Sequence, residues 1–228
     1  IAELTLWPEY GQNCPVCVGK MSSMGECGIY QWDVGAPDRL VCSYCKTEYP
    51  NADYPETGSV TAPRMGQTFT FYETDEERAH PHDRSGRYAF KWVNYPVHTS
   101  WSGVLRSKRA TWCVEQMELL AKLYAVVGEV ECAERAAWIL DIFAQRYPNW
   151  LFHAYDGTVA DLPPAAAAAE MGRNPRGGKF AAESIISAFE GRHQQGDHAV
   201  LCNGFWGAGR LGCSGSDSGF LLEALRCY

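Results

Sequence analysis

The 228-residue sequence lacks any apolar run near the roughly 20 residues that a membrane-spanning helix needs. It also has few basic residues, since 20 Lys and Arg stand against 27 Asp and Glu and give a formal net charge of −7. A general nucleic-acid-binding protein needs a basic surface to neutralise phosphates. We therefore expect neither a membrane nor a nucleic acid as partner. A local basic surface that binds an acidic ligand remains compatible with this net charge.

Cysteine, in contrast, is abundant with ten residues, and four of them form two pairs of equal spacing. Cys14 and Cys17 make one C-x2-C pair, and Cys42 and Cys45 make the other. Two such turns complete a tetrahedral ligand set for zinc. Four protein ligands leave no open position for water, so we expect a structural zinc ion that helps to fold the loops around it. Two disulfides, a redox motif, or Cys27 in place of one ligand are the alternatives.

Composition divides the chain into two parts. Residues 1–60 are rich in Gly, Pro and Cys and predict a small zinc-bound module of loops and short strands. Residues 61–228 predict a mainly α domain, although residues 61–106 show no helical period and favour strands or loops. From residue 84 to residue 109, six basic residues occur without an acidic one, either as a solvated face or as one wall of a groove for an acidic ligand: Arg84, Arg87, Lys91, Arg106, Lys108 and Arg109.

From residue 107 onward, apolar residues recur every three or four positions and predict two helices. The first covers 107–127 and ends at Gly128, and the second covers 130–146 and stops before Pro148. Because the connection is very short, we expect an antiparallel helix hairpin. Its buried faces are expected to include Met117, Leu120, Tyr124, Ala136, Ile139 and Phe143.

Three more helices are expected over residues 165–169, 179–190 and 217–228, with a Gly-rich stretch from 204 to 212. The last predicted helix ends on apolar residues without a Gly or polar cap. This favours the hypothesis that the chain is a fragment of a longer protein.

The order of these segments resembles heparinase II/III-type polysaccharide lyases. The resemblance lies in the zinc cysteines followed by Glu48-Tyr49-Pro50, the helix pair that ends in the stretch 136–148, the stretch 206–210, and the helix 217–228. It implies an incomplete α/α toroid built of antiparallel helix hairpins, and β-sandwich layers outside this sequence. It also implies a secreted or periplasmic enzyme that acts on acidic polysaccharides such as glycosaminoglycans or alginate.

Family members cleave uronic-acid polysaccharides by β-elimination, which requires a group that neutralises the uronate carboxylate, a base and an acid. The family's Asn-His pair has no counterpart here, so no catalytic residue is assigned and the catalytic centre is expected mostly beyond residue 228. Candidate substrate contacts are aromatic side chains that stack on sugars and cations that pair with carboxylates. These candidates are Trp206, Arg210, Tyr95, His98 and Trp101.

The same candidates have structural interpretations, with Trp206 in a core and Arg210 in an ion pair.

Two other function classes also remain open. A non-catalytic zinc-containing scaffold would need repeated helical units, and only one tetratricopeptide-like unit is visible. A toroid-type glycoside hydrolase would need two carboxylates across a cleft, and no pattern pairs the acids Asp156, Asp161, Glu170, Glu183 and Asp217.

Overall fold

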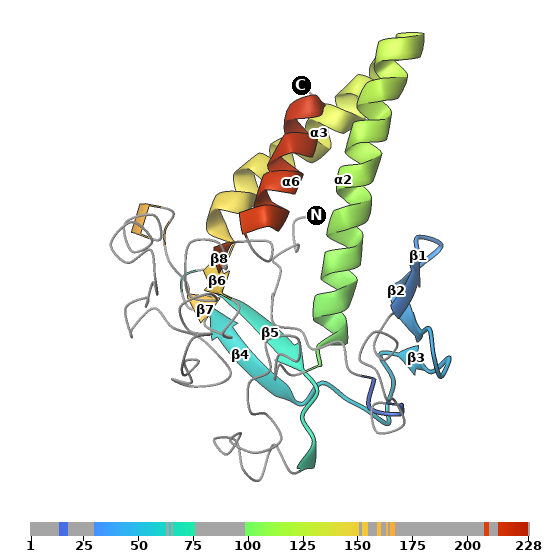
Figure 1. Cartoon of the computed structure of the whole chain (residues 1–228), viewed down its shortest axis with the longest axis vertical. Helices are drawn as coiled ribbons and strands as arrows, with labels where there is room; N and C mark the ends of the chain where they lie inside the picture. The colour runs from blue at the N-terminus through green and yellow to red at the C-terminus, as the bar shows by residue number, and fades with distance from the viewer. Residues whose placement is uncertain are drawn as a thin grey trace.

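The computed structural model describes residues 14–17, 30–62, 64, 66–75, 99–150, 152–154, 159–160, 163, 165–166, 208–209 and 214–227. This part of the chain is partly helical and carries small antiparallel sheets at the foot of the helices (Figure 1). The expected combination of helices with a cysteine-rich strand module is therefore present. A closed or incomplete toroid is not established by these elements.

The cysteine-rich module contains a three-stranded sheet of β1 (Tyr30–Asp33), β2 (Ala36–Cys42) and β3 (Glu48–Tyr49) in that order. Its register pairs Trp32 with Leu40 and Leu40 with Tyr49. Leu40 and Tyr49 are buried, whereas neighbouring positions on β2 and β3 are more exposed, as expected for a sheet with one covered face. β2 is the middle strand of this sheet, and Cys42 at its end is fully buried.

A second hairpin consists of β4 (Gly58–Ala62) and β5 (Gln67–Phe71). Phe69 and Phe71 of β5 are buried and alternate with more exposed threonines. The domain boundary expected at residue 60 falls inside β4, so the strand pairing continues across it. The composition change at residue 60 thus falls within a strand, and the cross-strand pairing of β4 with β5 spans it.

The longest helix among the described residues is α2 (Trp101–Val127), which begins six residues earlier than the expected position 107. The Ser100 side chain accepts a hydrogen bond from the Gly103 amide at 3.0 Å and caps the first turn. Gly128 ends the helix with φ 72°, as the sequence predicted. The apolar periodicity did not predict this earlier start, because Trp101, Val104 and Leu105 are buried against the strand module. They lie on a different face of α2 from the apolar residues that pack against α3.

Helix α3 (Val130–Arg146) follows after a two-residue turn and packs antiparallel against α2 (Figure 1). The predicted hairpin is thus confirmed, with bounds that match the expected 130–146. A 3-10 turn, η2 (Tyr147–Asn149), contains Pro148 and follows the helix directly. Proline cannot donate the backbone hydrogen bond that would continue the helix, which explains the stop.

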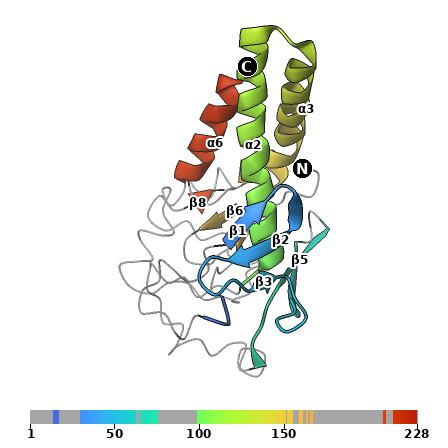
Figure 2. The same ribbon diagram turned by 90° about the vertical axis from the view of Figure 1, so that its right-hand side faces the viewer.

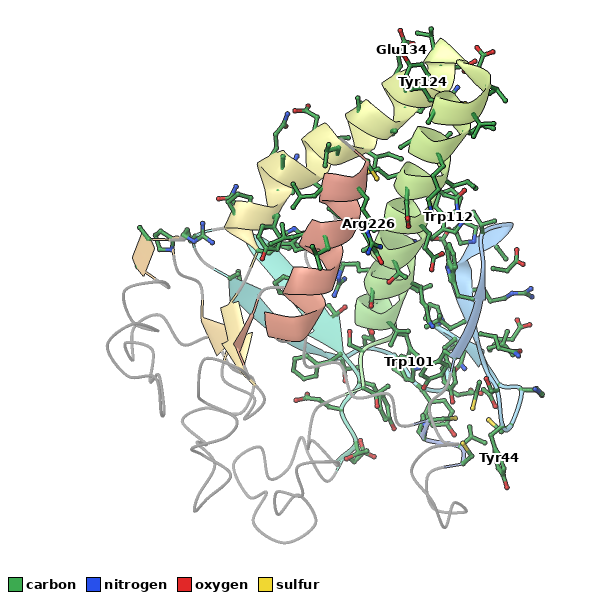
Figure 3. All side chains as sticks on the ribbon, turned by 45° about the horizontal axis from the view of Figure 1, so that its top comes forward. Tyr44, Trp101, Trp112, Tyr124, Glu134 and Arg226 are labelled. Carbon is green, nitrogen blue, oxygen red and sulfur yellow. The ribbon has the colours of Figure 1, made fainter. Side chains whose placement is uncertain are left out.

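The core of the hairpin confirms most of the predicted buried faces. Met117, Ala136, Ile139 and Phe143 are buried, and Leu120 packs against them while half-buried. The prediction for Tyr124 is wrong, because this side chain is 45% exposed near the tip of the hairpin (Figure 3). No described element covers the tip, so a helical position that periodicity places on the inner face still contacts solvent there.

The C-terminal helix α6 (Ser214–Arg226) lies alongside the hairpin and packs against α2 (Figure 1). Ala224 of this helix and Cys227, which follows it, pack against the core of the hairpin. It begins three residues before the expected position 217. A small sheet of β7 (Val159–Ala160), β6 (Phe152–Ala154) and β8 (Ala208–Gly209) joins the chain after η2 to the Gly-rich stretch. The helices predicted over 165–169 and 179–190 lie outside the described residues, except for two helical residues at 165–166.

Truncation of Phe143 to Ala should lower the free energy of unfolding by about 3–5 kcal/mol, measured by chemical denaturation. The side chain is 2% exposed and packs edge-on against Trp150, with ring centroids 6.0 Å apart. Leu119→Ala is the control, because Leu119 lies on the same hairpin and is 57% exposed. An equal loss in both variants would contradict the assigned inner face.

Candidate metal centre

The four cysteines of the predicted zinc site come from two backbone turns. In the first turn, the Cys17 amide donates to the Cys14 carbonyl at 3.2 Å. The second turn follows β2, and there the Lys46 amide donates to the Cys42 carbonyl at 3.0 Å. Lys46 has φ 62°, a left-handed conformation that reverses the chain toward β3. Each turn therefore presents two thiols on one side.

The four Sγ atoms converge into one cluster. All lie within 4.8 Å of one another, with Cys14 and Cys45 at 3.5 Å and Cys17 and Cys42 at 3.9 Å. A tetrahedral metal with bonds of about 2.3 Å to sulfur places its ligands about 3.8 Å apart, which these separations match. A disulfide requires about 2.05 Å between sulfurs. The structure thus favours a metal site over the two-disulfide alternative, and all four cysteines are free.

The surroundings of the cluster are apolar and aromatic. Cys14, Cys17 and Cys42 are fully buried, and Cys45 is half-buried at the edge. Among the described residues, this is the single group of three or more Cys, His, Asp or Glu side chains placed to hold a metal ion. Four soft sulfur ligands, three of them fully buried, suit a closed structural site rather than a catalytic one.

The electrostatics of the thiols differ across the cluster. Burial raises the pKa of Cys14, where water cannot solvate a thiolate. Burial also acts to raise the pKa of Cys45, but hydrogen bonds with Thr47 outweigh it and lower the pKa to about 6. The Thr47 hydroxyl lies 3.2 Å from the Cys45 sulfur. A lowered pKa favours the thiolate, which is the form of cysteine that binds a metal.

Tyr49 forms part of the second layer around the cluster. Its hydroxyl lies 3.1 Å from the Cys14 sulfur, and burial raises the pKa of Tyr49 well above its ordinary value. The phenol thus keeps its proton and can donate a hydrogen bond to a thiolate. Such outer contacts orient metal ligands and tune their basicity. The stretch Glu48-Tyr49-Pro50 was noted in the sequence, but only the structure shows that Tyr49 contacts the sulfur.

Trp101 connects this second layer to α2. Its indole stacks on the Tyr49 ring with centroids 4.5 Å apart and planes inclined by 6°, and its Nε1 donates to the Tyr30 hydroxyl at 3.3 Å. Figure 3 shows Trp101 at the lower end of α2, between the helix and the cysteine-rich strands. The first turns of α2 and the cysteine cluster therefore share one core, which also contains Leu40, Val104 and Leu105.

This position corrects one prediction. Trp101 was one of the candidate substrate contacts, yet its side chain is 0% exposed and offers no face to a sugar ring. A tryptophan beside basic and aromatic residues fits both a sugar platform and a core, and the sequence alone does not separate them. Its complete burial shows that Trp101 is a core residue.

The other predicted contacts, Tyr95, His98, Trp206 and Arg210, lie outside the described residues, as does Cys27. The short strand β8 separates Trp206 from Arg210 in the sequence and pairs with His153 and Ala154 of β6 through its backbone.

Glu56 is a structural residue that the sequence reasoning missed. Its carboxylate accepts hydrogen bonds from the Ser102 amide at 2.9 Å and from the Thr70 hydroxyl at 2.5 Å. An acidic group at the first turn stabilises a helix, because it satisfies free amides and complements the helix dipole. Glu56 is 46 residues away from Ser102 in the sequence, so no local capping pattern predicts this contact.

Neither a family model, nor a curated protein, nor a solved structure matches this chain. No helix in the described ranges has both the length and the apolar character needed to cross a bilayer. The candidate metal centre therefore rests on the spacing of its cysteines and on the geometry of their sulfur atoms.

Proposed function

We propose that Cys14, Cys17, Cys42 and Cys45 bind one zinc ion with a structural role. Closed sites of four cysteines commonly hold zinc, with iron as the main competitor for tetrahedral sulfur ligands. The observation that carries the proposal is the convergence of all four sulfurs within 4.8 Å in a buried pocket. Elemental analysis of the purified chain should find about one zinc per chain. One equivalent of iron, with its visible absorption, would assign the site to iron instead.

We further propose that this zinc-braced helical unit belongs to a polysaccharide lyase of the heparinase II/III type. Support comes from the sequence resemblance together with the order of the elements: a four-cysteine module, an antiparallel helix hairpin and a further helix packed on it. On this proposal, α2, α3 and α6 contribute to an incomplete α/α toroid. The substrate is a polysaccharide that contains uronic acid, and the reaction is β-elimination.

The chemistry of elimination sets what the chain must supply. The uronate carboxylate must be neutralised so that the adjacent proton becomes acidic, a base must remove that proton, and an acid must protonate the leaving oxygen. All three groups act only when one cleft holds them together. The sequence offers no motif match for any of the three, so we assign none of them here.

The isolated 228-residue chain should accordingly release no unsaturated product from alginate, heparan sulfate or chondroitin. The ultraviolet absorbance of the unsaturated uronate measures this directly. A form extended beyond residue 228 should cleave at least one of these polymers. New reducing ends without new ultraviolet absorbance would replace the lyase proposal with the hydrolase alternative. No cleavage of any of the three polymers by the extended form would replace it with the scaffold alternative.

A further inference from the structure

A second candidate site lies apart from the metal centre, between α2 and the start of β5. It is a pocket of about 490 Å³ lined by one face of α2 and by the strand that faces it. Binding sites for small molecules typically have volumes of roughly 300–1,000 Å³. Figure 1 shows β5 beside the lower end of α2, where the two elements pack together. The lining residues are Gly66, Gln67, Thr68, Ser102, Leu105, Arg106 and Arg109.

Two arginines supply the charge of this pocket. Arg106 and Arg109 are three positions apart on α2 and so lie on the same side of the helix. They belong to the basic stretch that the sequence singled out as one wall of a groove for an acidic ligand. The guanidinium of Arg106 lies over the Phe69 ring, 5.3 Å from its centroid, which holds the side chain beside β5.

The cysteine-rich module positions Arg109. Its Nε and Nη2 donate to the Pro37 carbonyl at 3.2 and 3.0 Å, and it forms an ion pair with Asp38. Both partners belong to β2, the strand that ends at Cys42 (Figure 2). Within the described part of the chain, Nη1 of Arg109 has no hydrogen-bond partner. One edge of this guanidinium is thus fixed by the protein while the other can face a ligand.

The remaining lining residues are mostly small and polar. The Thr68 hydroxyl hydrogen-bonds only to Thr61 among described residues, at 2.9 Å, and retains acceptor capacity. Gln67 contributes an amide that can both donate and accept. Leu105 provides one apolar surface beside these groups. Guanidinium groups pair with carboxylates in planar geometry, whereas amides and hydroxyls pair with ligand hydroxyls.

We propose that this pocket binds a small organic carboxylate that carries hydroxyl groups, which is the chemical class of sugar acids. The site follows from the geometry of α2, β5 and β2. Only the identification of its natural ligand with a uronate of a polysaccharide rests on the proposed function.

Titration of the zinc-loaded 228-residue chain by NMR tests the proposal with four probes. D-glucuronate should give saturable shifts at the backbone amides of residues 66–68 and 102–109. D-glucose lacks the charge and should give none. Acetate and inorganic phosphate lack the hydroxyl-bearing ring, and each should bind at least about fivefold more weakly than glucuronate, because they lose the contacts to Gln67 and Thr68.

Three variants locate the binding. Arg106→Gln should weaken glucuronate binding at least about tenfold, since a charged hydrogen bond is lost. Gln67→Ala, on the opposite wall, should weaken it about threefold to tenfold. Lys108→Gln is the matched control, because it removes the same charge from an exposed neighbour on α2 that does not line the pocket. It should change the affinity by less than about twofold.

Several outcomes would overturn the proposal. Equal weakening in Arg106→Gln and Lys108→Gln would show non-specific attraction to the basic stretch. Equal affinity for acetate or phosphate and glucuronate would show a simple anion site without sugar recognition, and no saturable shift with glucuronate would exclude the site. Helical circular dichroism and zinc content identify a variant that fails to fold. If Arg106→Gln fails to fold, Arg106→Lys replaces it. Its affinity for glucuronate should fall at least about threefold, because an ammonium group lacks the planar paired donors of a guanidinium. None of these measurements depends on lyase turnover, so failure of the lyase proposal remains distinguishable.

Discussion

Replacement of Cys42 by Ser is expected to abolish stoichiometric metal binding and to unfold the cysteine-rich module. Cys42 is fully buried and supplies one of four sulfurs that lie within 4.8 Å of one another. Its loss leaves three thiols around an open position, and the binding energy of a structural zinc ion is folding energy. We expect the free energy of unfolding of the module to fall by more than about 4 kcal/mol. Elemental analysis and denaturant unfolding measure both effects.

The damage should extend into α2 but stop short of the hairpin core. Trp101 and Leu105 share a core with the cysteines, whereas Met117 and Phe143 belong to a separate cluster between α2, α3 and α6. Hydrogen exchange in Cys42→Ser should therefore accelerate over β1, β2, β3 and the first two turns of α2. The amides around Met117 should keep most of their protection, because their packing does not involve the module.

Cys132→Ser provides the matched control. Cys132 is a half-buried thiol on α3, outside the cluster, and the same chemical change there should leave zinc content unaltered. If Cys42→Ser retains one zinc per chain and wild-type exchange rates, the cysteines are not the metal ligands. If exchange accelerates equally along the whole hairpin, the two cores are not separate units of stability.

Trp101→Ala should have the second-largest effect, a loss of about 3–5 kcal/mol in the free energy of unfolding. The indole is 0% exposed, stacks on Tyr49 and donates a hydrogen bond to Tyr30. Its removal leaves a cavity between the cysteine-rich module and α2 and breaks the hydrogen bond that the indole donates to the Tyr30 hydroxyl. Denaturant unfolding of the zinc-loaded chain measures the loss, and a lower affinity for zinc should accompany it.

Trp138→Ala separates this core role from a general effect of removing tryptophan. Trp138 lies on α3 and is 61% exposed, so its replacement should change stability by less than about 0.5 kcal/mol. A Trp101→Ala variant with wild-type stability and weakened binding of acidic sugars would restore the substrate-contact interpretation.

The cluster of four cysteines and the helix hairpin were both predictable from the sequence. Cysteines three apart can reach one metal through a local turn, so the C-x2-C spacing carries its own geometry. Apolar residues at helical intervals, with Gly128 and Pro148 as stop signals, likewise act within a few residues of chain. Burial predicted from this periodicity is confirmed for Met117, Ala136, Ile139 and Phe143. It is wrong for Tyr124, whose exposure depends on whether another segment covers the tip of the hairpin.

Only the tertiary structure decided what depends on partners far apart in the sequence. Trp101 is a core residue because Tyr49, 52 positions earlier, offers a ring to stack on. The start of α2 depends on Glu56, and the placement of Arg109 depends on Pro37 and Asp38. The sequence alone determined which residue types could bind metal or form helices, because those properties are local. Burial and the pairing of charges were decided by the packing of distant segments, because both depend on which surfaces the fold brings together.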